Sequence, residues 1–240
     1  MKEKIIELKN IQKVINNKLI LDKVNISFEC NSFTTIIGMS GSGKTTLLNI
    51  LCGLEYPTHG EVFVKKTNIN NLKKVQLTKF RSLNIGYIFQ DYNLIDYLNV
   101  KENILITLMV NKQKVDKIKY LNILKFLDLE KIEFVVANEL SGGEKQRVAI
   151  ARTLVGENKI IIADEPTGSL DFITAKKVIK LLKEAVNEFD KTLIVVTHDP
   201  NVAKEGEKTF VVKNNEVKML KNKFEISEIE YYLSNDGKNE

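Results

Sequence analysis

A glycine-rich run that ends in a lysine and a threonine gives the clearest chemical signal in the sequence. Residues 38–45 read Gly-Met-Ser-Gly-Ser-Gly-Lys-Thr and match the pattern G-x-x-x-x-G-K-[ST] at every defined position. Such a run turns consecutive backbone N–H groups toward one anion, and the N-terminus of a following helix adds positive potential. Lys44 can reach the β- and γ-phosphates of a nucleotide, and the Thr45 hydroxyl can bind Mg²⁺. We therefore predict a binding site for a nucleotide phosphate chain.

Two acids follow a short apolar run later in the chain. The run Ile160–Ala163 reads as a buried strand, and Asp164 and Glu165 come directly after it. At the tip of such a strand Asp164 would hold Mg²⁺, directly or through water, and Glu165 would polarise an attacking water as a general base. Alone, the pair also fits an ordinary acidic turn at a strand end. Beside a complete phosphate-binding loop it favours a nucleotide hydrolase.

A serine followed by two glycines opens a helical stretch between these two motifs and forms a third candidate site. Residues 140–147 read Leu-Ser-Gly-Gly-Glu-Lys-Gln-Arg and lead into the helix-like segment Val148–Leu154. The Ser141 side chain and the N–H groups of Gly142 and Gly143 would form a second anion site at a helix N-terminus.

Residues 140–147 resemble the signature motif of the ATP-binding cassette (ABC) ATPases, and the resemblance covers about residues 5–220. Gln90, where a strand gives way to a helical region, resembles the Q-loop glutamine of that family. Residues 169–171, Ser-Leu-Asp, resemble its D-loop. His198 follows another apolar strand and is similar to the switch histidine, which contacts the γ-phosphate in the family.

The resemblance implies a role for each matching residue. For catalysis it implies Glu165, His198, Gln90 and Lys44, and for Mg²⁺ it implies Thr45, Gln90 and Asp164. The residues that it implies for ATP binding are Gly38, Ser40, Gly41, Ser42, Gly43, Lys44, Thr45, Thr46, Ile15, Ser141, Gly142, Gly143 and Glu144.

The resemblance also implies two protein partners. In the family, two cassettes pair head to tail, and each nucleotide lies between the phosphate loop of one chain and the signature serine, here Ser141, of the other. The second partner is an integral-membrane permease that docks through its coupling helices. We expect an apolar groove for such a helix around Gln90, formed by Tyr87, Tyr92, Leu94, Ile95, Tyr97 and Leu98.

Two positions depart from the family pattern. Ile15 stands where the family usually has an aromatic residue that stacks on adenine, an interaction worth about 1–3 kcal/mol by analogy with bases stacked on aromatics. We therefore predict weaker or less base-selective nucleotide binding. Asn31 replaces a glycine common before the phosphate-loop strand, a tolerable change because asparagine readily enters left-handed backbone conformations.

The elements that must position these residues form an α/β pattern. Short runs rich in β-branched residues alternate with segments of helical period, which predicts a mainly parallel sheet. The expected strands are Ile5–Leu8, Val24–Phe28, Phe33–Ile37, Glu61–Val64, Ile85–Phe89, Ile160–Ala163, Leu193–Val196 and Phe210–Val212. With the resemblance, the predicted fold class is a P-loop NTPase: a RecA-like core with an antiparallel β region and an inserted helical subdomain.

Helical periodicity replaces the strand signals between Asp91 and Glu157. Helices are expected over Thr45–Cys52, Val100–Val110, Val115–Phe126, Val148–Leu154 and Ile173–Phe189. The predicted domains are a core of residues 1–90 and 158–220, a helical signature subdomain of residues 91–157, and a polar tail of residues 221–240.

Composition narrows the class of protein. The 240 residues carry 36 basic and 31 acidic side chains, a net charge of +5 that is too weak to indicate nucleic-acid binding. No apolar run is long enough to span a bilayer, and the charged N-terminal segment does not fit a signal peptide. Two cysteines and two histidines are too few ligands to favour a structural zinc site. We expect a peripheral protein on the cytoplasmic side of the cell membrane.

Within the ABC proteins, the chain resembles most the branch that serves lipoprotein release, macrolide export and peptide-antibiotic resistance. Residues 89–96 and 100–104 are especially similar to bacitracin-exporter ATPases of Gram-positive bacteria. The expected function is therefore to energise a membrane transporter that exports or clears a peptide antibiotic, lipopeptide or lipoprotein. The alternative is a mechanical or signalling ATPase that acts on a membrane partner without transport, because the same motor serves both. Soluble cassettes of DNA repair and translation are disfavoured, because the chain has no second cassette.

Overall fold

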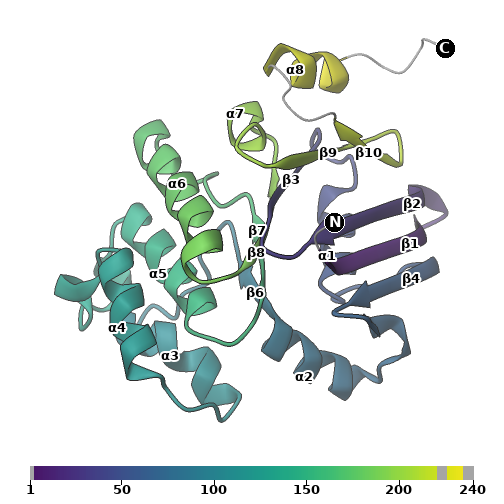
Figure 1. Ribbon diagram of the computed structural model, residues 1–240. Helices are drawn as coiled ribbons and strands as arrows, with labels where there is room; N and C mark the ends of the chain where they lie inside the picture. The colour runs from purple at the N-terminus through teal and green to yellow at the C-terminus, as the bar shows by residue number, and fades with distance from the viewer. Residues whose placement is uncertain (1–2, 221–225, 235–240) are drawn as a thin grey trace. The chain divides into compact units, whose positions relative to one another are not determined.

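The computed structural model describes residues 3–220 and 226–234 of the chain. It divides into two compact units (Figure 1). Unit 1 comprises Met1–Thr78 and Ile194–Glu240, and unit 2 comprises Lys79–Leu193. Helix α2 (Lys74–Asn84) and strand β8 (Thr192–Thr197) each continue from one unit into the other.

Unit 1 contains a four-stranded antiparallel sheet in the order β2-β1-β4-β5. Its strands are β1 (Lys4–Ile15), β2 (Lys18–Glu29), β4 (His59–Val64) and β5 (Thr67–Asn68). Asn16 and Asn17 connect β1 to β2 with positive φ angles of 48° and 62°. A two-residue hairpin of this kind needs positive φ at both positions, and asparagine accepts it at low cost.

The other strands of unit 1 carry the glycine-rich loop. Strand β3 (Phe33–Ile37) pairs in parallel with β9 (Lys208–Lys213), and β10 (Glu216–Leu220) pairs antiparallel with β9. Asn31, just before β3, has φ 51°, the left-handed conformation that the sequence predicted for it. Helix α1 (Lys44–Leu51) follows the loop after β3.

Two short helices complete unit 1, α7 (Pro200–Ala203) and α8 (Ile226–Ser234). Ile229 of α8 is fully buried in a cluster with Ile37, Ala203, Val211 and Leu220. The end of β3, which leads into the glycine-rich loop, is therefore packed on one side by residues from the last described part of the chain.

Unit 2 joins a parallel strand pair to a group of helices. Strands β6 (Ile85–Ile88) and β7 (Ile160–Asp164) pair from Ile85 opposite Ile160 to Ile88 opposite Ala163. The helices are α3 (Val100–Val110), α4 (Lys117–Phe126), α5 (Gly142–Leu154) and α6 (Phe172–Glu188). Helix α5 contacts α3, α4, α6 and β6 and so lies at the centre of the unit.

Local capping sequences explain where three of these helices begin. Asn99 and Glu102 form a capping box at α3, and Ser141 and Glu144 form another at α5. At α6 the Asp171 carboxylate accepts hydrogen bonds from the backbone N–H groups of the first turn. Side chains thus satisfy N–H groups that a helix start would leave without partners.

The predicted α/β fold class is confirmed, with some differences in detail. Strands β3, β7 and β8 are buried along nearly their whole length, as expected for apolar runs without alternation. Helix α2, strand β5 and strand β10 were not predicted: α2 and β10 are mostly exposed and polar, and β5 has only two residues. The predicted domain boundaries stay a prediction, and the tail residues 221–225 and 235–240 lie outside the described part of the chain.

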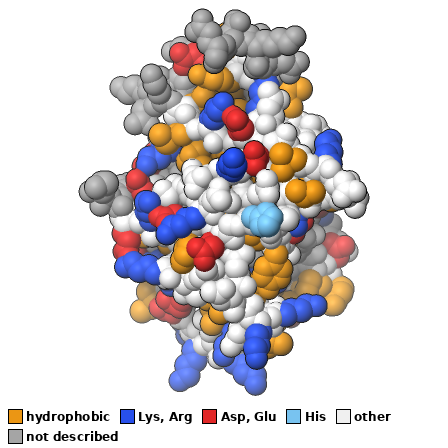
Figure 2. Space-filling view, turned by 90° about the vertical axis from the view of Figure 1, so that its right-hand side faces the viewer, with side chains coloured by type: hydrophobic (Ala, Val, Ile, Leu, Met, Phe, Trp, Pro, Cys, Tyr) orange, Lys and Arg blue, Asp and Glu red, His pale blue; other side chains and the backbone are white. Residues whose placement is uncertain are grey.

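Within residues 3–220 and 226–234, no helix is long and apolar enough to cross a membrane. Figure 2 shows acidic and basic side chains interspersed over the middle of one face, with hydrophobic side chains in separate groups between them. Such a mixed surface is typical of a protein without a strong electrostatic field of one sign.

Candidate nucleotide-binding site

The glycine-rich loop of unit 1 has the backbone that anion binding requires. The five residues of β3 are buried, which fixes the point where the loop begins. Gly41 and Gly43 have φ angles of 75° and 102°, in the left-handed region that favours glycine. Gly43 is the N-cap of α1 and provides no side-chain oxygen, so the first N–H groups of α1 are left for another acceptor.

Close packing also explains why two of these positions carry glycine. A Cβ atom at Gly38 would lie 2.6 Å from both Ser42 Oγ and the backbone oxygen of Val212. A Cβ atom at Gly43 would lie 3.1 Å from Cγ2 of Ile20 on β2. The backbone of Val212 and the side chain of Ile20 therefore leave little room for a side chain at these two positions of the loop.

The polar side chains of the loop fit a phosphate ligand. Lys44 is buried, and its Nζ donates to the backbone oxygens of Gly38 and Met39 at 2.8 and 2.9 Å. The buried Ser42 hydroxyl has no hydrogen-bond partner among the described residues. A buried hydroxyl without a partner, an ammonium group and an open helix N-terminus are the groups that a nucleotide phosphate would satisfy. Thr45, the candidate Mg²⁺ ligand, is exposed.

Ile15 and His198 also belong to unit 1. Ile15 is the last residue of β1 and is 37% exposed, opposite Lys18 in the hairpin. The neighbouring strand β2 lies beside the loop, since Cγ2 of its residue Ile20 would be 3.1 Å from a Cβ atom at Gly43. His198 is exposed directly after β8, and Asp199 next to it caps α7 by accepting from Asn201 N at 2.8 Å.

The two candidate acids lie at the end of β7 in unit 2. Four buried residues lead to Asp164, which is half-buried and accepts a hydrogen bond from the Tyr87 hydroxyl at 3.4 Å. Glu165 has φ 47°, and its backbone oxygen accepts from Gly168 N at 3.0 Å. A left-handed conformation costs a residue other than glycine about 1 kcal/mol, and such strain is often retained at functional positions.

Gln90 lies next to the residues that follow these acids. It is exposed just after β6, the parallel neighbour of β7, so both strands end at the same edge. A Cβ atom at Gly168 would lie 3.3 Å from Gln90 Nε2, and the Ser169 hydroxyl lies 3.5 Å from the Gln90 backbone oxygen. Unit 2 therefore brings together the Gln90 segment and the residues that resemble a D-loop.

The start of α5 is tightly organised around Ser141. The Glu144 carboxylate accepts from Ser141 N at 2.8 Å and from Ser141 Oγ at 2.6 Å, and these bonds lower the pKa of Glu144. A Cβ atom at Gly142 would lie 3.0 Å from the Tyr92 hydroxyl. One at Gly143 would lie 2.9 Å from Thr174 Cγ2 of α6.

Sequence reasoning did not identify Arg152 or the role of Tyr92. In the last turn of α5, Arg152 donates from Nη1 to the backbone oxygen of Asn93 at 2.6 Å and from Nη2 to that of Tyr92 at 2.8 Å. The sequence did contain one indication of this role. Arg152 is the single charged residue in the apolar segment Val148–Leu154, and a cation in such a segment indicates fixed partners.

Unit 2 also contains a cavity of about 410 Å³ beside Arg152. Apolar side chains of β6 and α3 form much of its wall, together with Arg152 and Thr153 of α5 and the backbone after α5. The residues that line it are Ser82, Leu83, Ile85, Gly86, Tyr87, Phe89, Asn93, Ile106, Thr107, Val110, Asn111, Gln113, Arg152, Thr153, Gly156, Glu157 and Asn158.

The composition of this cavity differs from the groove expected around Gln90. Of the side chains predicted for the groove, Tyr87 lines the cavity, whereas Tyr92, Leu94, Ile95, Tyr97 and Leu98 do not. Tyr97 is instead 81% exposed. Phe89 and Asn93, close to Gln90 in sequence, also line the cavity, together with residues of α3 and α5 that only the fold brings to this place.

Comparison with known proteins decides the family. The family model described as "ABC transporter" matches residues 21–168. The chain belongs to the ABC transporter family as an ATP-binding protein. Its classification as an ABC-type ATPase, made from the signature-like residues 140–147, is thereby confirmed.

Several relatives support this assignment over most of their length. An uncharacterized ABC transporter ATP-binding protein of Methanocaldococcus jannaschii, MJ0796, is 42% identical over 223 residues, covering 89% of this ABC protein and 95% of the relative. The bacitracin export ATP-binding protein BceA of Halalkalibacterium halodurans is 37% identical over 219 residues, covering 89% and 87%. The lipoprotein-releasing system ATP-binding protein LolD of Buchnera aphidicola is 39% identical over 198 residues, covering 80% and 86%.

Solved structures confirm the P-loop NTPase fold. A dimeric structure of MJ0796 in a post-hydrolysis state, bound to ADP and Pi, has a TM-score of 0.79 and 39% identity; it covers 92% of this chain and 100% of that one. The cbiO1 protein of Clostridium perfringens, part of an ABC transporter complex, has a TM-score of 0.84 and 28% identity, covering 96% and 92%.

Proposed function

We propose that this ABC ATPase energises a membrane transporter that exports or clears a peptide antibiotic, lipopeptide or lipoprotein. Relatives named for bacitracin export, lipoprotein release and macrolide export support this class of substrate. The main support for ATP binding is the loop at residues 38–45. Its glycines are left-handed, the N-terminus of the following helix is open, and the buried Ser42 hydroxyl has no hydrogen-bond partner among the described residues.

Nucleotide binding is assigned to two sets of residues. In the proposal, backbone N–H groups of residues 38–46, with Lys44, hold the phosphates, and Ile15 covers one face of the base. Thr45, Gln90 and Asp164 supply the oxygen ligands that Mg²⁺ prefers. When bound, Mg²⁺ offsets negative charge on the phosphate oxygens.

Hydrolysis in this proposal depends on positioning and charge. Glu165 accepts the proton of the attacking water, and its strained backbone at the end of a rigid strand fixes where the carboxylate can lie. Lys44 and His198 stabilise the charge on the transferred phosphoryl group. Gln90 orients the water, since its amide both donates and accepts hydrogen bonds.

The proposed active form is a head-to-tail dimer of two copies. Ser141 and the glycines after it begin a helix whose N-terminal N–H groups suit the γ-phosphate of a nucleotide bound to the other copy. Dimeric structures of the 39–40% identical relative support this form.

The second proposed partner is an integral-membrane permease, which places this ATPase at the cytoplasmic side of the membrane. The cavity of unit 2, which we call the groove, supports this proposal. It is open and largely apolar, and Ile106, Val110 and Phe89, just before Gln90, are among the residues that line it. A coupling helix of a permease would place its apolar face against these side chains.

Glu165→Gln tests the proposed function. The substitution keeps the shape of the side chain but removes the base, so ATP turnover should fall by about 10²-fold or more while ATP binding persists. Size-exclusion chromatography with ATP and Mg²⁺ should then show a stable dimer. The control is Glu184→Gln, which alters an exposed carboxylate on α6. Full turnover in the Glu165 variant would remove Glu165 from its assigned role.

A further inference from the structure

Arg152 is held between the groove and the residues that follow Gln90. Its guanidinium lines the groove together with Asn93. The same guanidinium donates one hydrogen bond to the backbone oxygen of Tyr92 and one to that of Asn93. Partial burial lowers the pKa of Arg152, so the two carbonyl dipoles are important partners for a charge that has lost part of its water.

The backbone that Arg152 holds is a strained turn. Tyr92 and Asn93 have φ angles of 59° and 47°; asparagine accepts such an angle at low cost, but tyrosine does not. Backbone bonds from Tyr92 N to Phe89 O and from Asn93 N to Asp91 O close the turn directly around Gln90. A strained residue such as Tyr92 persists only where surrounding contacts fix it. Arg152, reaching across about 60 residues of sequence, supplies such contacts.

The Tyr92 side chain extends the connection to two other functional segments. Its hydroxyl forms a hydrogen bond with the Ser169 side chain, in the segment that resembles a D-loop. The same hydroxyl borders Gly142 so closely that a Cβ atom there would lie 3.0 Å from it. Ser169 Oγ also approaches the Gln90 backbone oxygen at 3.5 Å. One tyrosine thus contacts the surroundings of Gln90, Ser169 and the start of α5.

We propose that Arg152 is a positioning residue that couples occupancy of the groove to the Gln90 turn, Ser169 and Gly142 through Tyr92. This inference rests on the proposed function, because it requires an occupant in the groove and a dimer that engages Ser141 and Ser169. A segment that enters the groove contacts Arg152 and Asn93, and any shift of the guanidinium moves the two carbonyl oxygens that it holds. Tyr92 then carries the shift to the dimer-facing residues.

Coupling of this kind acts in both directions. ATP-driven dimer formation must therefore change the environment of the groove even when no permease is present. The sequence contains no tryptophan, so a single introduced indole gives an unmixed fluorescence signal. Phe89→Trp places that indole in the wall of the groove, next to the Tyr87 ring, whose centroid lies 4.2 Å from that of Phe89.

The experiment measures two quantities in a Glu165→Gln, Phe89→Trp parent chain with ATP and Mg²⁺. Size-exclusion chromatography reports dimer formation, and tryptophan emission reports the groove. We expect an ATP-dependent emission change in the parent. In Arg152→Met that change should shrink by roughly fivefold or more, at the low end of typical coupling between sites, while the dimer still forms. Arg152→Lys keeps the charge but cannot hold both oxygens with one planar group, so an intermediate change is expected.

Matched variants separate coupling from a loss of stability. Gln113→Ala alters another residue that lines the groove and should keep the full emission change. Tyr92→Phe keeps the backbone bonds to Arg152 but removes the hydroxyl bond to Ser169, so its emission change should also shrink. A merely structural role for Arg152 would lower the unfolding temperature and leave the emission change intact.

Each outcome has a definite meaning. An emission change in Arg152→Met as large as in the parent overturns the coupling role. If Arg152→Met does not fold, the coupling role is overturned when Arg152→Lys and Tyr92→Phe both show an ATP-dependent emission change as large as that of the parent. A parent that forms no ATP-dependent dimer contradicts the proposed function, and the coupling role with it. A parent that forms the dimer without an emission change contradicts the coupling role alone.

Discussion

Gly143 and Thr174 are in such close contact that a methyl group at position 143 would lie 2.9 Å from Thr174 Cγ2. The second glycine of the signature-like run is therefore required by the contact between α5 and α6. The neighbouring Thr174 is itself fixed, because its side chain and backbone N–H both bond to Asp171 at the start of α6.

This contact predicts a rescue experiment within the chain. Gly143→Ala should destabilise the protein by about 1–3 kcal/mol through overpacking, and ATP turnover should fall because α5 shifts. Thr174→Ser removes only the clashing methyl and keeps the hydroxyl, so the double variant should regain most of the loss. Urea unfolding of all four chains measures the coupling energy. Additive losses would show that Thr174 is not the obstacle.

The exposed position of Ile15 makes base recognition easy to test. Ile15→Tyr supplies an aromatic face at the end of β1, so ATP should bind more tightly by about 1–3 kcal/mol if the base lies there. Fluorescent ATP and GTP analogues would measure affinity and base preference. The control is Ile15→Val, which keeps an aliphatic side chain. Tight and strongly ATP-selective binding by the unaltered chain would contradict the predicted deficit.

The groove proposed for a permease predicts that a charge introduced at its edge weakens permease binding. Val110→Asp places a charge in an apolar contact and should reduce co-purification with the membrane permease by about tenfold or more. Val75→Asp on α2 is the matched control, because Val75 is exposed but does not line the groove. Equal recovery of the permease with both variants would contradict this docking place.

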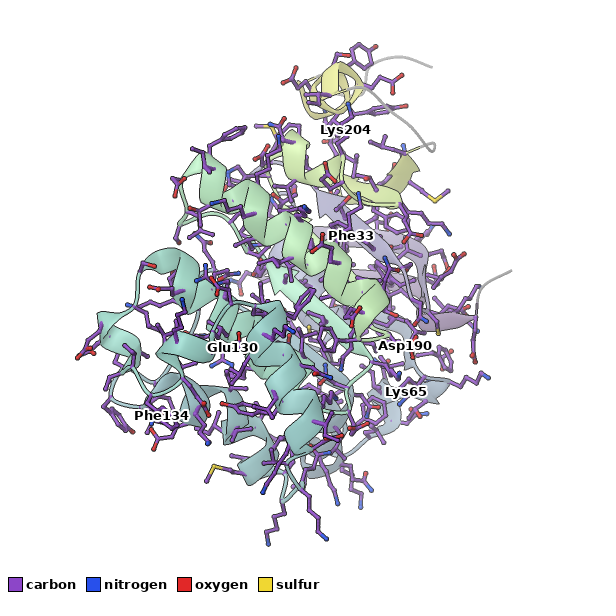
Figure 3. The ribbon with its side chains drawn as sticks, turned by 60° about the vertical axis from the view of Figure 1, so that its left-hand side comes forward. Phe33, Lys65, Glu130, Phe134, Asp190 and Lys204 are labelled. Atoms are coloured by element: carbon purple, nitrogen blue, oxygen red, sulfur yellow. The ribbon has the colours of Figure 1, made fainter. Side chains whose placement is uncertain are left out.

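Lys191 predicts how stability changes with pH. It is 2% exposed, its Nζ donates to the backbone oxygens of Gly156 and Asn158, and burial lowers its pKa to about 7. Lys119 and Lys159 also lower the pKa, whereas Glu157 and Asp190, the latter just beyond α6 in Figure 3, raise it.

The sign follows from proton binding. Between about pH 7 and pH 10 the unfolded chain keeps the Lys191 proton that the folded chain has lost, so the free energy of unfolding should rise with pH, by at most about 1.4 kcal/mol per pH unit. Lys191→Met should flatten this rise in urea titrations at several pH values. Lys176→Met, an exposed lysine on α6, should leave it unchanged. An equally steep rise in the Lys191 variant would assign the effect to other groups.

Local patterns explain how much the sequence could predict. The loop at residues 38–45 and the acids after β7 are recognisable because their function depends on spacing along one short segment. The left-handed conformation expected of Asn31 is equally local. The roles of His198 and Gln90 were implied by the resemblance to the ABC ATPases and stay predictions. The structure places His198 directly after β8 and Gln90 two residues beyond the end of β6.

The missed features depend on contacts far apart in sequence. Arg152 meets residues about 60 positions earlier, and nothing near it in the chain specifies those partners. The groove expected around Gln90 stays a prediction. The cavity beside Arg152 could not be predicted for the same reason: Val110 and Ile106 line it only because α3 packs beside α5. Lys191 looks like an ordinary surface lysine in the sequence, and only the fold makes it buried.

The Ser141 hydroxyl already donates a hydrogen bond to the Glu144 carboxylate when the chain stands alone. In the head-to-tail dimer proposed above, a γ-phosphate bound to the other copy must compete with Glu144 for this hydrogen bond, and the negative charge of Glu144 repels it. The binding free energy gained at this half of the pocket is then small, and it becomes smaller once the phosphate has been cleaved. The helix cap would thus act as a built-in competitor that favours prompt separation of the two copies after each turnover.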